Sequence, residues 1–338
     1  MGNLKNKFSI ILPLKNGGEY ARSCVNSILA QTCRDFSLII LDNCSSDDNL
    51  NWLRNLNDNR IIIHTSARPL KIEENWSRIK SVDKNEFMTM IGHDDILHPH
   101  YLKTMEMLID KHPRASLFQT HFNYINEKGE LLRACKPMEE IMTVAGFISA
   151  HCLQSLDSSG SGYMIRSVDY NSLGGIPTDY PGFIFADYEL WINLISKGYL
   201  AISKDNCFSY RLNQSASQTM GAEKYQKSFF HYLDFLKEIM EKDMDCKKAV
   251  ERDGIHLFNY YCRSLSHRLL KSSYRDRKTK IWQFVNKCKE YAEFMIPNHP
   301  FHPYLNPSIM AAVFLDNKPG KWLFKKARKY LGSPYQNR

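Results

Sequence analysis

The stretch Glu86-Phe-Met-Thr-Met-Ile-Gly-His-Asp-Asp-Ile-Leu-His-Pro99 decides the fold that we expect from this sequence. It begins with a short apolar run, typical of a buried strand, that stops at Gly92. Asp94 and Asp95 follow, and two carboxylates at the end of a buried strand repel each other and lose hydration, so a cation is a natural partner. Their hard oxygen atoms favour Mg²⁺ or Mn²⁺, ions that also hold phosphate. Pro99 is expected to start the next helix, and the simpler alternative is that the two aspartates only cap that helix.

Apolar strands alternate with amphipathic helices around this stretch. The expected strands are 8–14, 36–42, 60–65 and 87–91, and the expected helices between them are 19–31, 49–56 and 73–82. This alternation predicts a parallel central sheet with helices on both faces. Ligands bind at the carboxyl ends of the strands in such sheets, so Asp42 and Asp94 are expected in one crevice.

The remaining sequence indicates more of this sheet and then a helical region. We expect helices at 101–111, 139–150 and 186–198, and strands at 115–126, 161–166, 200–203 and 207–211. After about residue 222 the pattern changes to long helices at 225–240, 247–270 and 279–294, a proline-rich connector at 297–307 and a basic segment at 318–331. We therefore expect one domain at 1–221 and a helical region at 222–338.

Composition restricts the classes of partner. The chain of 338 residues has a formal net charge of +9, which favours anionic partners such as nucleotide phosphates or an acidic membrane surface. It carries no recognisable nucleic-acid-binding motif, so nucleic acid is not an expected partner. The nine cysteines are scattered and never form Cys-x-x-Cys, which favours reduced thiols over a zinc site or disulfides. Without an apolar signal core or a long uncharged stretch, a cytoplasmic location is expected.

The basic segment 318–331 predicts contact with a membrane surface. It combines lysine and arginine with Trp322, Leu323 and Phe324, which is the composition of an interfacial amphipathic helix. We therefore expect the protein on the inner face of the cell membrane as a peripheral protein. The alternative, which the sequence supports equally, is a helix packed on the domain at 1–221 with a solvated basic face.

A set of short motifs occurs in order along the first two thirds of the chain. They are Phe8-Ser-Ile-Ile-Leu-Pro-Leu-Lys-Asn16, Cys24-Val-Asn-Ser-Ile-Leu-Ala-Gln-Thr32, Leu38-Ile-Ile-Leu-Asp-Asn-Cys-Ser-Ser-Asp47, Asn75-Trp76, Gly92-His-Asp-Asp-Ile-Leu-His-Pro99, Gly174-Gly175, Asp187-Tyr-Glu-Leu-Trp191 and Tyr210-Arg211. In this order and spacing the chain resembles an inverting family 2 glycosyltransferase over residues 8 to about 217. The resemblance implies a GT-A nucleotide-diphospho-sugar transferase fold for a catalytic domain at 1–221. The helices at 222–338 would be an appendage.

The resemblance implies a set of donor-binding residues. Pro13 and Asp42 would hold the nucleotide base, although Pro13 is also a plausible strand terminator and Asp42 a cap for the following turn. Arg68 and Asn75 would reach the base or the phosphates, and a solvated loop charge is an equal alternative for Arg68. His93 would contribute to the donor site as well.

The resemblance also places the metal. The family's Asp-x-Asp motif would begin at Gly92, so this sequence keeps only the second carboxylate, Asp94, followed by Asp95. Asp94 is the expected ligand of Mg²⁺ or Mn²⁺, with Asp95 beside it, and His93 is expected to replace part of the missing carboxylate. A histidine that often follows Tyr-Arg in the family is Asn213 here, so a third protein ligand stays open.

Asp187 is the expected general base. It lies at the start of a predicted helix, where the helix dipole would lower its pKa, and a simple N-cap is the alternative role. The other acids considered are Asp157, Asp179 and Glu189. Asp157 and Asp179 are expected in loops without an ordering pattern, and Glu189 is expected on a different face of the helix.

The implied reaction moves a sugar from a nucleotide-diphosphate donor, by default a UDP-hexose or UDP-N-acetylhexosamine, to a hydroxyl of a glycan or lipid-linked acceptor with inversion. Such transfers build polysaccharides of the cell envelope. A nicotinamide-dependent enzyme would need Gly-x-Gly-x-x-Gly after the first strand, and Lys15-Asn-Gly-Gly18 does not supply it. A nucleotidyltransferase would need a basic glycine-rich loop there. A non-catalytic nucleotide-sugar-binding protein stays open because of Gly92 and Asn213.

Overall fold

A computed structural model describes residues 6–212, 221–273 and 277–331 of the chain. The chain divides into two compact units. The first comprises Met1–Phe147 and Ser155–Gln218, and the second comprises Ile148–Gln154 and Thr219–Arg338. The sequence did not predict that the short segment Ile148–Gln154 would group with the C-terminal helices.

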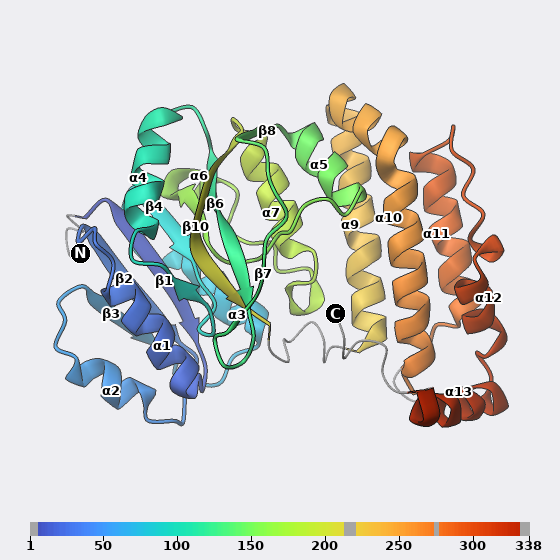
Figure 1. Cartoon of the computed structure of the whole chain (residues 1–338), viewed down its shortest axis with the longest axis horizontal. Helices are drawn as coiled ribbons and strands as arrows, with labels where there is room; N and C mark the ends of the chain where they lie inside the picture. Colours follow the sequence, from blue (N-terminus) through green and yellow to red (C-terminus); the bar gives the residue numbers. More distant parts are fainter. Residues whose placement is uncertain (1–5, 213–220, 274–276, 332–338) are drawn as a thin grey trace. The chain divides into compact units, whose positions relative to one another are not determined.

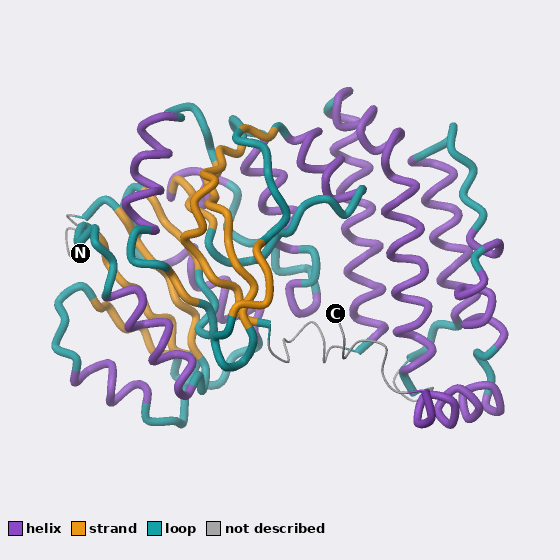
Figure 2. The backbone as a smooth tube through the Cα atoms, in the orientation of Figure 1, coloured by secondary structure: helices purple, strands orange, loops and turns teal. Residues whose placement is uncertain are grey.

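The first unit is built on one sheet with strand order β3-β2-β1-β4-β9-β6-β10-β5, drawn as arrows in Figure 1 and in orange in Figure 2. The strands are β1 Phe8–Leu14, β2 Phe36–Asp42, β3 Ile61–Thr65, β4 Phe87–Met90, β5 Ile96–Leu97, β6 Leu117–Ile125, β7 Leu131–Ala134, β8 Ile141–Met142, β9 Tyr163–Arg166 and β10 Leu200–Arg211. Strands β1 to β4 are parallel neighbours, as the sequence predicts. Strand β9 is antiparallel to both β4 and β6, so the sheet as a whole is mixed.

The helices of this unit follow the expected order. They are α1 Gly18–Leu29, α2 Asn49–Asn55, α3 Ile72–Ser77 with the 3₁₀ turn Arg78–Ser81, α4 Tyr101–Lys111, the start of α5 Val144–Cys152, α6 Ser167–Ser172 and α7 Ala186–Ile195. The predicted α/β fold class is therefore confirmed.

Three local predictions were wrong in detail. Pro99 does not start a helix, because α4 begins at Tyr101 and the Pro99 carbonyl accepts a hydrogen bond from Thr32 N at 2.9 Å. The helix expected at 139–150 begins later, because β8 first pairs with β10. The two strands expected at 200–211 are one, with irregular register between Ser203 and Phe208.

The central strand β1 explains how a proline is accommodated inside a sheet. Every residue of β1 and of β2 is buried, since both strands have neighbours on each side. Pro13 pairs in register with Leu41 of β2, but the β1–β4 ladder ends at the pair Ile11 and Met90. The missing N–H of Pro13 therefore interrupts no ladder on the β4 side.

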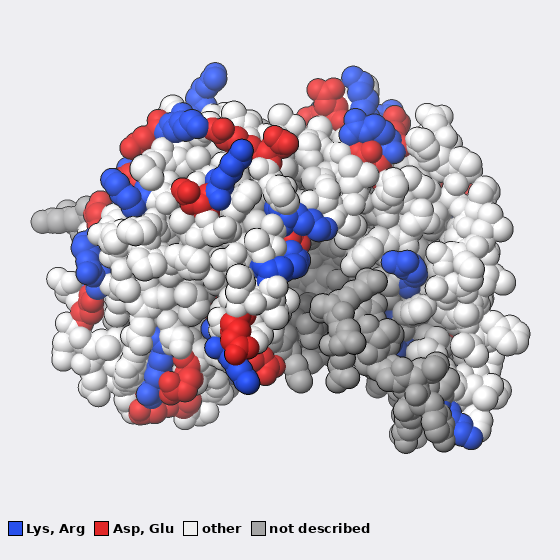
Figure 3. Space-filling view, viewed as in Figure 1, with Lys and Arg blue, Asp and Glu red and all other residues white. Residues whose placement is uncertain are grey.

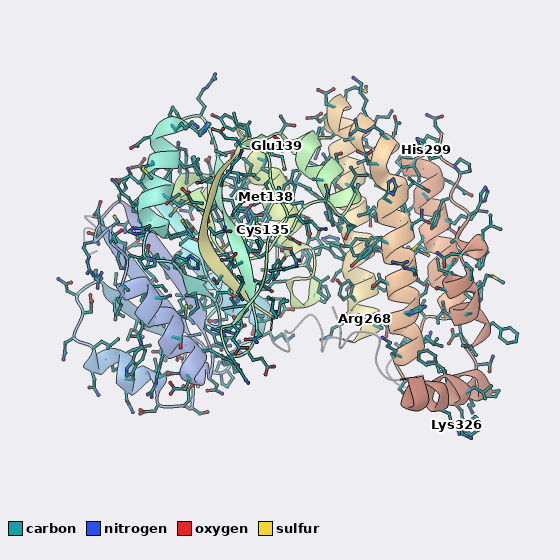
Figure 4. The ribbon with its side chains drawn as sticks, in the orientation of Figure 1. Cys135, Met138, Glu139, Arg268, His299 and Lys326 are labelled. Carbon is teal, nitrogen blue, oxygen red and sulfur yellow. The ribbon has the colours of Figure 1, made fainter. Side chains whose placement is uncertain are left out.

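The segment between β7 and β8 runs alongside β6. Cys135 N donates to the Phe122 carbonyl at 2.7 Å, and Met138 N donates to His121 Nε2 at 3.2 Å. Figure 4 labels Cys135 and Met138 along this segment. These contacts hold the connection against the antiparallel part of the sheet.

The second unit is a helical bundle. Its helices are α9 Ala222–Lys242, α10 Met244–Lys271, α11 Ile281–Met295, the 3₁₀ turn Pro303–Leu305, α12 Pro307–Phe314 and α13 Lys318–Leu331. The long helix α10 packs against α9, α11 and α12 (Figure 1). None of the helices within the described ranges is long and apolar enough to cross a membrane.

Buried polar contacts fix this bundle. His151, at the end of α5, lies 2.9 Å from the Tyr232 hydroxyl and 3.2 Å from the Tyr261 hydroxyl, and burial lowers its pKa to about 3. The buried Arg277 guanidinium pairs with Asp316, whose second oxygen accepts from the backbone N–H that opens α11. These contacts are internal to the helical unit.

Candidate active site

The loops that follow β1 and β2 are tied together at the carboxyl edge of the sheet. Asn43 N donates to the Leu14 carbonyl at 2.8 Å, directly after both strands end. Asn16 N donates to Ser45 Oγ at 3.0 Å, and its side-chain oxygen accepts from Ser46 N at 2.8 Å. These bonds join two of the loops in which the sequence predicts the donor site.

Asp42 has a structural role that can be seen directly. Its side chain is fully buried and accepts hydrogen bonds from Ser45 N at 3.2 and 3.4 Å, so it caps the turn after β2. Pro13 lies one residue before the end of the neighbouring strand and pairs with Leu41. The structure therefore brings Pro13 and Asp42 to the same edge, and their contact with a base stays a prediction.

Asn75 and Arg68 differ sharply in exposure. Asn75 is 4% exposed; its Nδ2 donates to the Leu41 carbonyl at 3.3 Å and its Oδ1 accepts from Arg78 Nη1 at 2.8 Å. Arg78 also donates to the Asp42 carbonyl at 2.8 Å. Asn75 thus anchors α3 to the end of β2. The Arg68 side chain is 71% exposed, 3.9 Å from Glu74, and available to a ligand.

Gly92 leaves room for the two carboxylates that follow it. A Cβ atom on Gly92 would lie 2.9 Å from Asp94 Oδ1 and 3.1 Å from Asp95 Oδ2. Both carboxylates therefore turn toward the same point beside the end of β4. Asp95 is 2% exposed, and burial together with the charge of Asp94 raises the pKa of Asp95 well above its usual range. Asp94 is only half-buried, so it is the more accessible of the two.

Arg211, the last residue of β10, holds this loop in place. Its N–H donates to Asp95 Oδ1 at 3.0 Å, and its Nε donates to the Asp94 carbonyl at 2.8 Å. Its Nη1 donates to the Asn126 carbonyl at 2.9 Å, and its guanidinium lies 4.8 Å from the Tyr20 ring centroid. One buried side chain thereby connects the carboxylate loop, the turn after β6 and α1.

His93 lies against the loop after β1. A Cβ atom on Gly17 would be 2.8 Å from His93 Cδ2 and 2.6 Å from Ala21 Cβ. Only glycine allows this close approach, because any side chain there would displace the imidazole. The structure therefore places His93 beside both the β1 loop and the carboxylates.

Asp187 lies in the first turn of α7, as the sequence predicts, but its pKa moves in the opposite direction. Burial raises the pKa of Asp187 from 3.8 to about 6, against hydrogen bonds from the backbone N–H groups of Tyr188 and of Asp187 itself. The Tyr188 N–H lies 3.0 Å from Asp187 Oδ1. The expected lowering by the helix N-terminus is thus outweighed by desolvation.

Three carboxylates act on the hydroxyl of Tyr210, a residue of β10. Burial raises the pKa of the Tyr210 hydroxyl, and the negative charges of Asp95, Asp94 and Asp187 raise it further. Charges beside the end of β4 and at the start of α7 are therefore within electrostatic reach of this tyrosine.

Trp191, on α7, is buried, stacks on Tyr163 at 4.2 Å and donates to a backbone carbonyl, so it packs rather than facing a sugar.

Two of the three competing acids, Asp157 and Glu189, are engaged elsewhere. Asp157 is better ordered than the sequence suggested: it accepts from Arg133 Nη1 at 2.7 Å and from Lys136 N at 2.8 Å, and its pKa is lowered. Glu189 accepts a hydrogen bond from the Tyr180 hydroxyl at 2.5 Å, and Asp179 is exposed. Asp157 is therefore a poorer base than Asp187.

Residues 9–163 match the family model described as Glycosyl transferase family 2. Over these residues the chain is similar to glycosyl transferase family 2, and the resemblance predicted from the sequence is therefore confirmed.

Three similar glycosyltransferases match the chain at low identity. An uncharacterized glycosyltransferase of Rickettsia felis is 23% identical over 243 residues, which are 70% of this chain and 39% of the relative. An uncharacterized glycosyltransferase of Rickettsia typhi is 20% identical over 241 residues, which are 70% of this chain and 73% of the relative. Glycosyltransferase GlyG of Streptococcus pneumoniae is 26% identical over 124 residues, 36% of this chain and 41% of that protein.

The fold matches a solved glycosyltransferase over nearly the whole chain. S. aureus TarS 1–349, solved in complex with UDP-GlcNAc, has a TM-score of 0.67 at 13% identity and covers 95% of this chain and 92% of that chain. At this identity the likeness shows the fold alone. It confirms the predicted GT-A fold with a helical C-terminal region.

The carboxylate pair Asp94 and Asp95 fits a divalent ion that takes most of its other ligands from a bound phosphate substrate. Mg²⁺ is commonly bound by one or two carboxylates together with substrate phosphates. Asp94 and Asp95 provide two converging carboxylates, as the distances from Gly92 show. Across the ranges that the structure describes, no group of three His, Cys, Asp or Glu side chains could hold a metal by itself. Asn213, the position of the open third ligand, lies outside the described residues.

Sequence reasoning missed several residues of the site. Tyr210 and Arg211 entered only as a motif of the family, without a role. Ser161 Oγ accepts from Gly92 N at 2.9 Å and hydrogen-bonds Asp95, and no sequence pattern distinguished it from other loop serines. Tyr210 and Arg211 stand at the end of a strand that runs to the same sheet edge as Asp94. This position was the signal in the sequence that could have indicated a role in the site.

Proposed function

We propose that this protein transfers a sugar from a nucleoside-diphosphate donor to a hydroxyl of a glycan or lipid-linked acceptor, with inversion at the anomeric carbon. The supporting observation is the convergence of Asp94 and Asp95 beside Gly92, in a segment that matches glycosyl transferase family 2, with Asp187 within electrostatic reach of Tyr210. UDP-sugars are the first donors to test, because a protein of similar fold binds UDP-GlcNAc. Hexoses and N-acetylhexosamines are the proposed sugar classes.

Asp187 is the proposed general base. An inverting transfer needs one group that removes the proton from the acceptor hydroxyl, and a carboxylate with a raised pKa accepts that proton more readily. A pKa of about 6 keeps Asp187 ionised at neutral pH while making it more basic than an ordinary aspartate. Such a base contributes typically about 10²–10⁴ in rate.

Asp94 is the proposed ligand of Mg²⁺ or Mn²⁺, with Asp95 beside it. When bound, the ion would supply positive charge to the diphosphate leaving group. Asp95 accepts from Arg211 N, so it also fixes the loop that presents Asp94. His93, beside Gly17, is proposed to contact the donor where the family's first aspartate is absent.

The nucleotide is proposed to lie over the ends of β1 and β2. Pro13 and Asp42 would border the base, Asn75 would hold the end of β2 in position, and the exposed Arg68 would reach the phosphates. The internal hydrogen bonds of Asn75 favour this positioning role over direct contact.

A non-catalytic nucleotide-sugar-binding protein is the second candidate, favoured by Gly92 in place of the family's first aspartate. The deciding experiment compares binding with turnover. We expect UDP release from a UDP-sugar in the presence of Mn²⁺, abolished by Asp187→Asn, whereas binding without release by the wild type would favour the second candidate.

Peripheral contact with the inner face of the cell membrane is proposed for α13, and with it a cytoplasmic location. The chain has no Asp or Glu after Asp316, and Trp322 and Leu323 are 60% and 53% exposed. Lys326, labelled in Figure 4, lies 5.1 Å from the Trp322 ring centroid. On the face drawn in Figure 3, by contrast, acidic and basic side chains alternate over α4 and its surroundings. Flotation with anionic liposomes, lost on truncation after Asn317, which removes α13 but keeps the pair between Arg277 and Asp316, tests this contact.

A further inference from the structure

The helical unit contains a cleft of its own, with a volume of about 710 Å³. It lies along α9 and α11 and is lined in part by Lys224, Lys227 and Lys287. All three lysine side chains are exposed, and none forms an ion pair with a carboxylate in the described ranges. The cleft is within the usual size range of ligand sites.

Gln226 gives the cleft an unfilled hydrogen-bonding site. It lines the cleft from α9 and is only 9% exposed, and its Oε1 has no hydrogen-bond partner in the part of the chain that the structure describes. A buried oxygen without a donor has lost its hydration without a replacement, so such a group indicates a missing partner. An amide oxygen accepts only, so that partner must donate, as a hydroxyl does.

Aromatic rings continue the cleft along the two helices. Lys287 Nζ lies 4.3 Å from the Phe230 ring centroid, and Phe230 stacks on Tyr291 at 5.4 Å. Lys237 Nζ lies 5.3 Å from Tyr291 and 4.4 Å from Phe294, which is 56% exposed. Lysines and aromatic rings therefore alternate beyond the cleft, an arrangement suited to a chain of phosphates and sugar or polyol units.

Acidic residues are present in the cleft but do not cancel its charge. Asp234 accepts a hydrogen bond from the Tyr291 hydroxyl at 2.6 Å, which ties it to the wall. Glu223 also lines the cleft. Against these two carboxylates stand three lysines, with Arg268 stacked 4.5 Å from the Tyr225 ring at the same end of α9 (Figure 4).

We propose that this cleft binds the acceptor, a phosphate-bearing glycan or polyol polymer. The lysines would contact phosphates, and Gln226 Oε1 would accept a hydrogen bond from a hydroxyl of the chain. This inference rests on the proposed function, because it names the acceptor class of the same transfer. Contacts with parts of a long acceptor other than its reacting hydroxyl add affinity that the transfer can use for orientation.

The test uses the full chain and a fluorescent poly(glycerol phosphate) oligomer as the probe. Wild type is compared with the double variant Lys227→Gln/Lys287→Gln, with Gln226→Leu, and with Lys248→Gln as a control. Lys248 is an exposed lysine of α10 that pairs with Asp245 and does not line the cleft. We expect the double variant to weaken binding at least about tenfold and Gln226→Leu several-fold, with the control unchanged.

Competing polymers show which chemical groups the cleft recognises, and UDP release shows separately whether the proposed function holds. Inorganic polyphosphate should compete weakly, because it lacks hydroxyls, and neutral dextran should not compete. Unchanged binding in the double variant, or equal binding of polyphosphate with no effect of Gln226→Leu, would overturn the proposal. UDP release without acceptor reports on the proposed function separately, and it should be the same in all four proteins. Melting temperatures within the wild-type range show that the variants are folded.

Discussion

Replacing Asp187 by asparagine should make the protein more stable and inactive at the same time. Burial raises the pKa of the Asp187 carboxyl from 3.8 to about 6, so the folded state holds this charge at a cost. Asparagine keeps the shape and can still accept the Tyr188 N–H, but it carries no charge. The gain in stability therefore accompanies the loss of the proposed base.

The size and sign of the stability effect follow from linkage. A shift of about two units corresponds to at most about 3 kcal/mol, and we expect about 1–3 kcal/mol because the side chain is only half-buried. A raised folded-state pKa means that the contribution of Asp187 is fully favourable below pH 3.8 and is lost as the pH rises through about 6. Asp187→Asn should therefore exceed the wild type in stability above pH 6 and match it near pH 4.

Urea unfolding at pH 4.5 and pH 7.5, together with UDP release at pH 7.5, measures both effects. Glu189→Gln serves as the control, because Glu189 is two residues along the same helix and hydrogen-bonds Tyr180. The wild-type turnover number should also fall on the acid side with an apparent pKa near 6. Near wild-type turnover of Asp187→Asn, or an inactive Glu189→Gln with an active Asp187→Asn, would show that the base is misassigned.

Three further substitutions test the site and the bundle. Gly92→Ala places a Cβ atom against Asp94 Oδ1 and should cost about 1–3 kcal/mol and weaken Mn²⁺-dependent donor binding, measured by unfolding and titration calorimetry. Arg211→Lys removes the fork that reaches the Asp94 and Asn126 carbonyls, and should lower turnover more than it lowers the melting temperature. Asp316→Asn removes the carboxylate that pairs with the buried Arg277 and should destabilise the protein by about 3–5 kcal/mol in urea unfolding without changing donor binding.

The first half of the sheet could be predicted from sequence because its signals are local. Strands β1, β2 and β4 are mostly apolar, and their alternation with helices predicts their parallel order. Strand β9 runs antiparallel between β4 and β6, and nothing in its four residues specifies those neighbours. Pairing over long sequence distances depends on the whole packed structure.

In the site, too, local features could be predicted from the sequence, and features that depend on packing could not. The position of Asp187 at a helix start was predictable, but its raised pKa was not, because desolvation depends on residues packed around it. Asn75 matched the family motif, yet its amide is used inside the protein. Arg211 acts through hydrogen bonds to a backbone carbonyl and to Asp95. Both partners lie more than eighty residues away from it in the sequence.

Release of nucleoside diphosphate from a panel of nucleotide sugars, with Mn²⁺ and after its removal by EDTA, tests the central claim most directly. We predict that the wild type releases UDP from at least one UDP-sugar only when Mn²⁺ or Mg²⁺ is present. Asp94→Asn should lose this dependence together with most of the rate while keeping the fold. Full activity in excess EDTA, or undiminished transfer by Asp94→Asn, would contradict a metal-assisted transfer at this carboxylate pair.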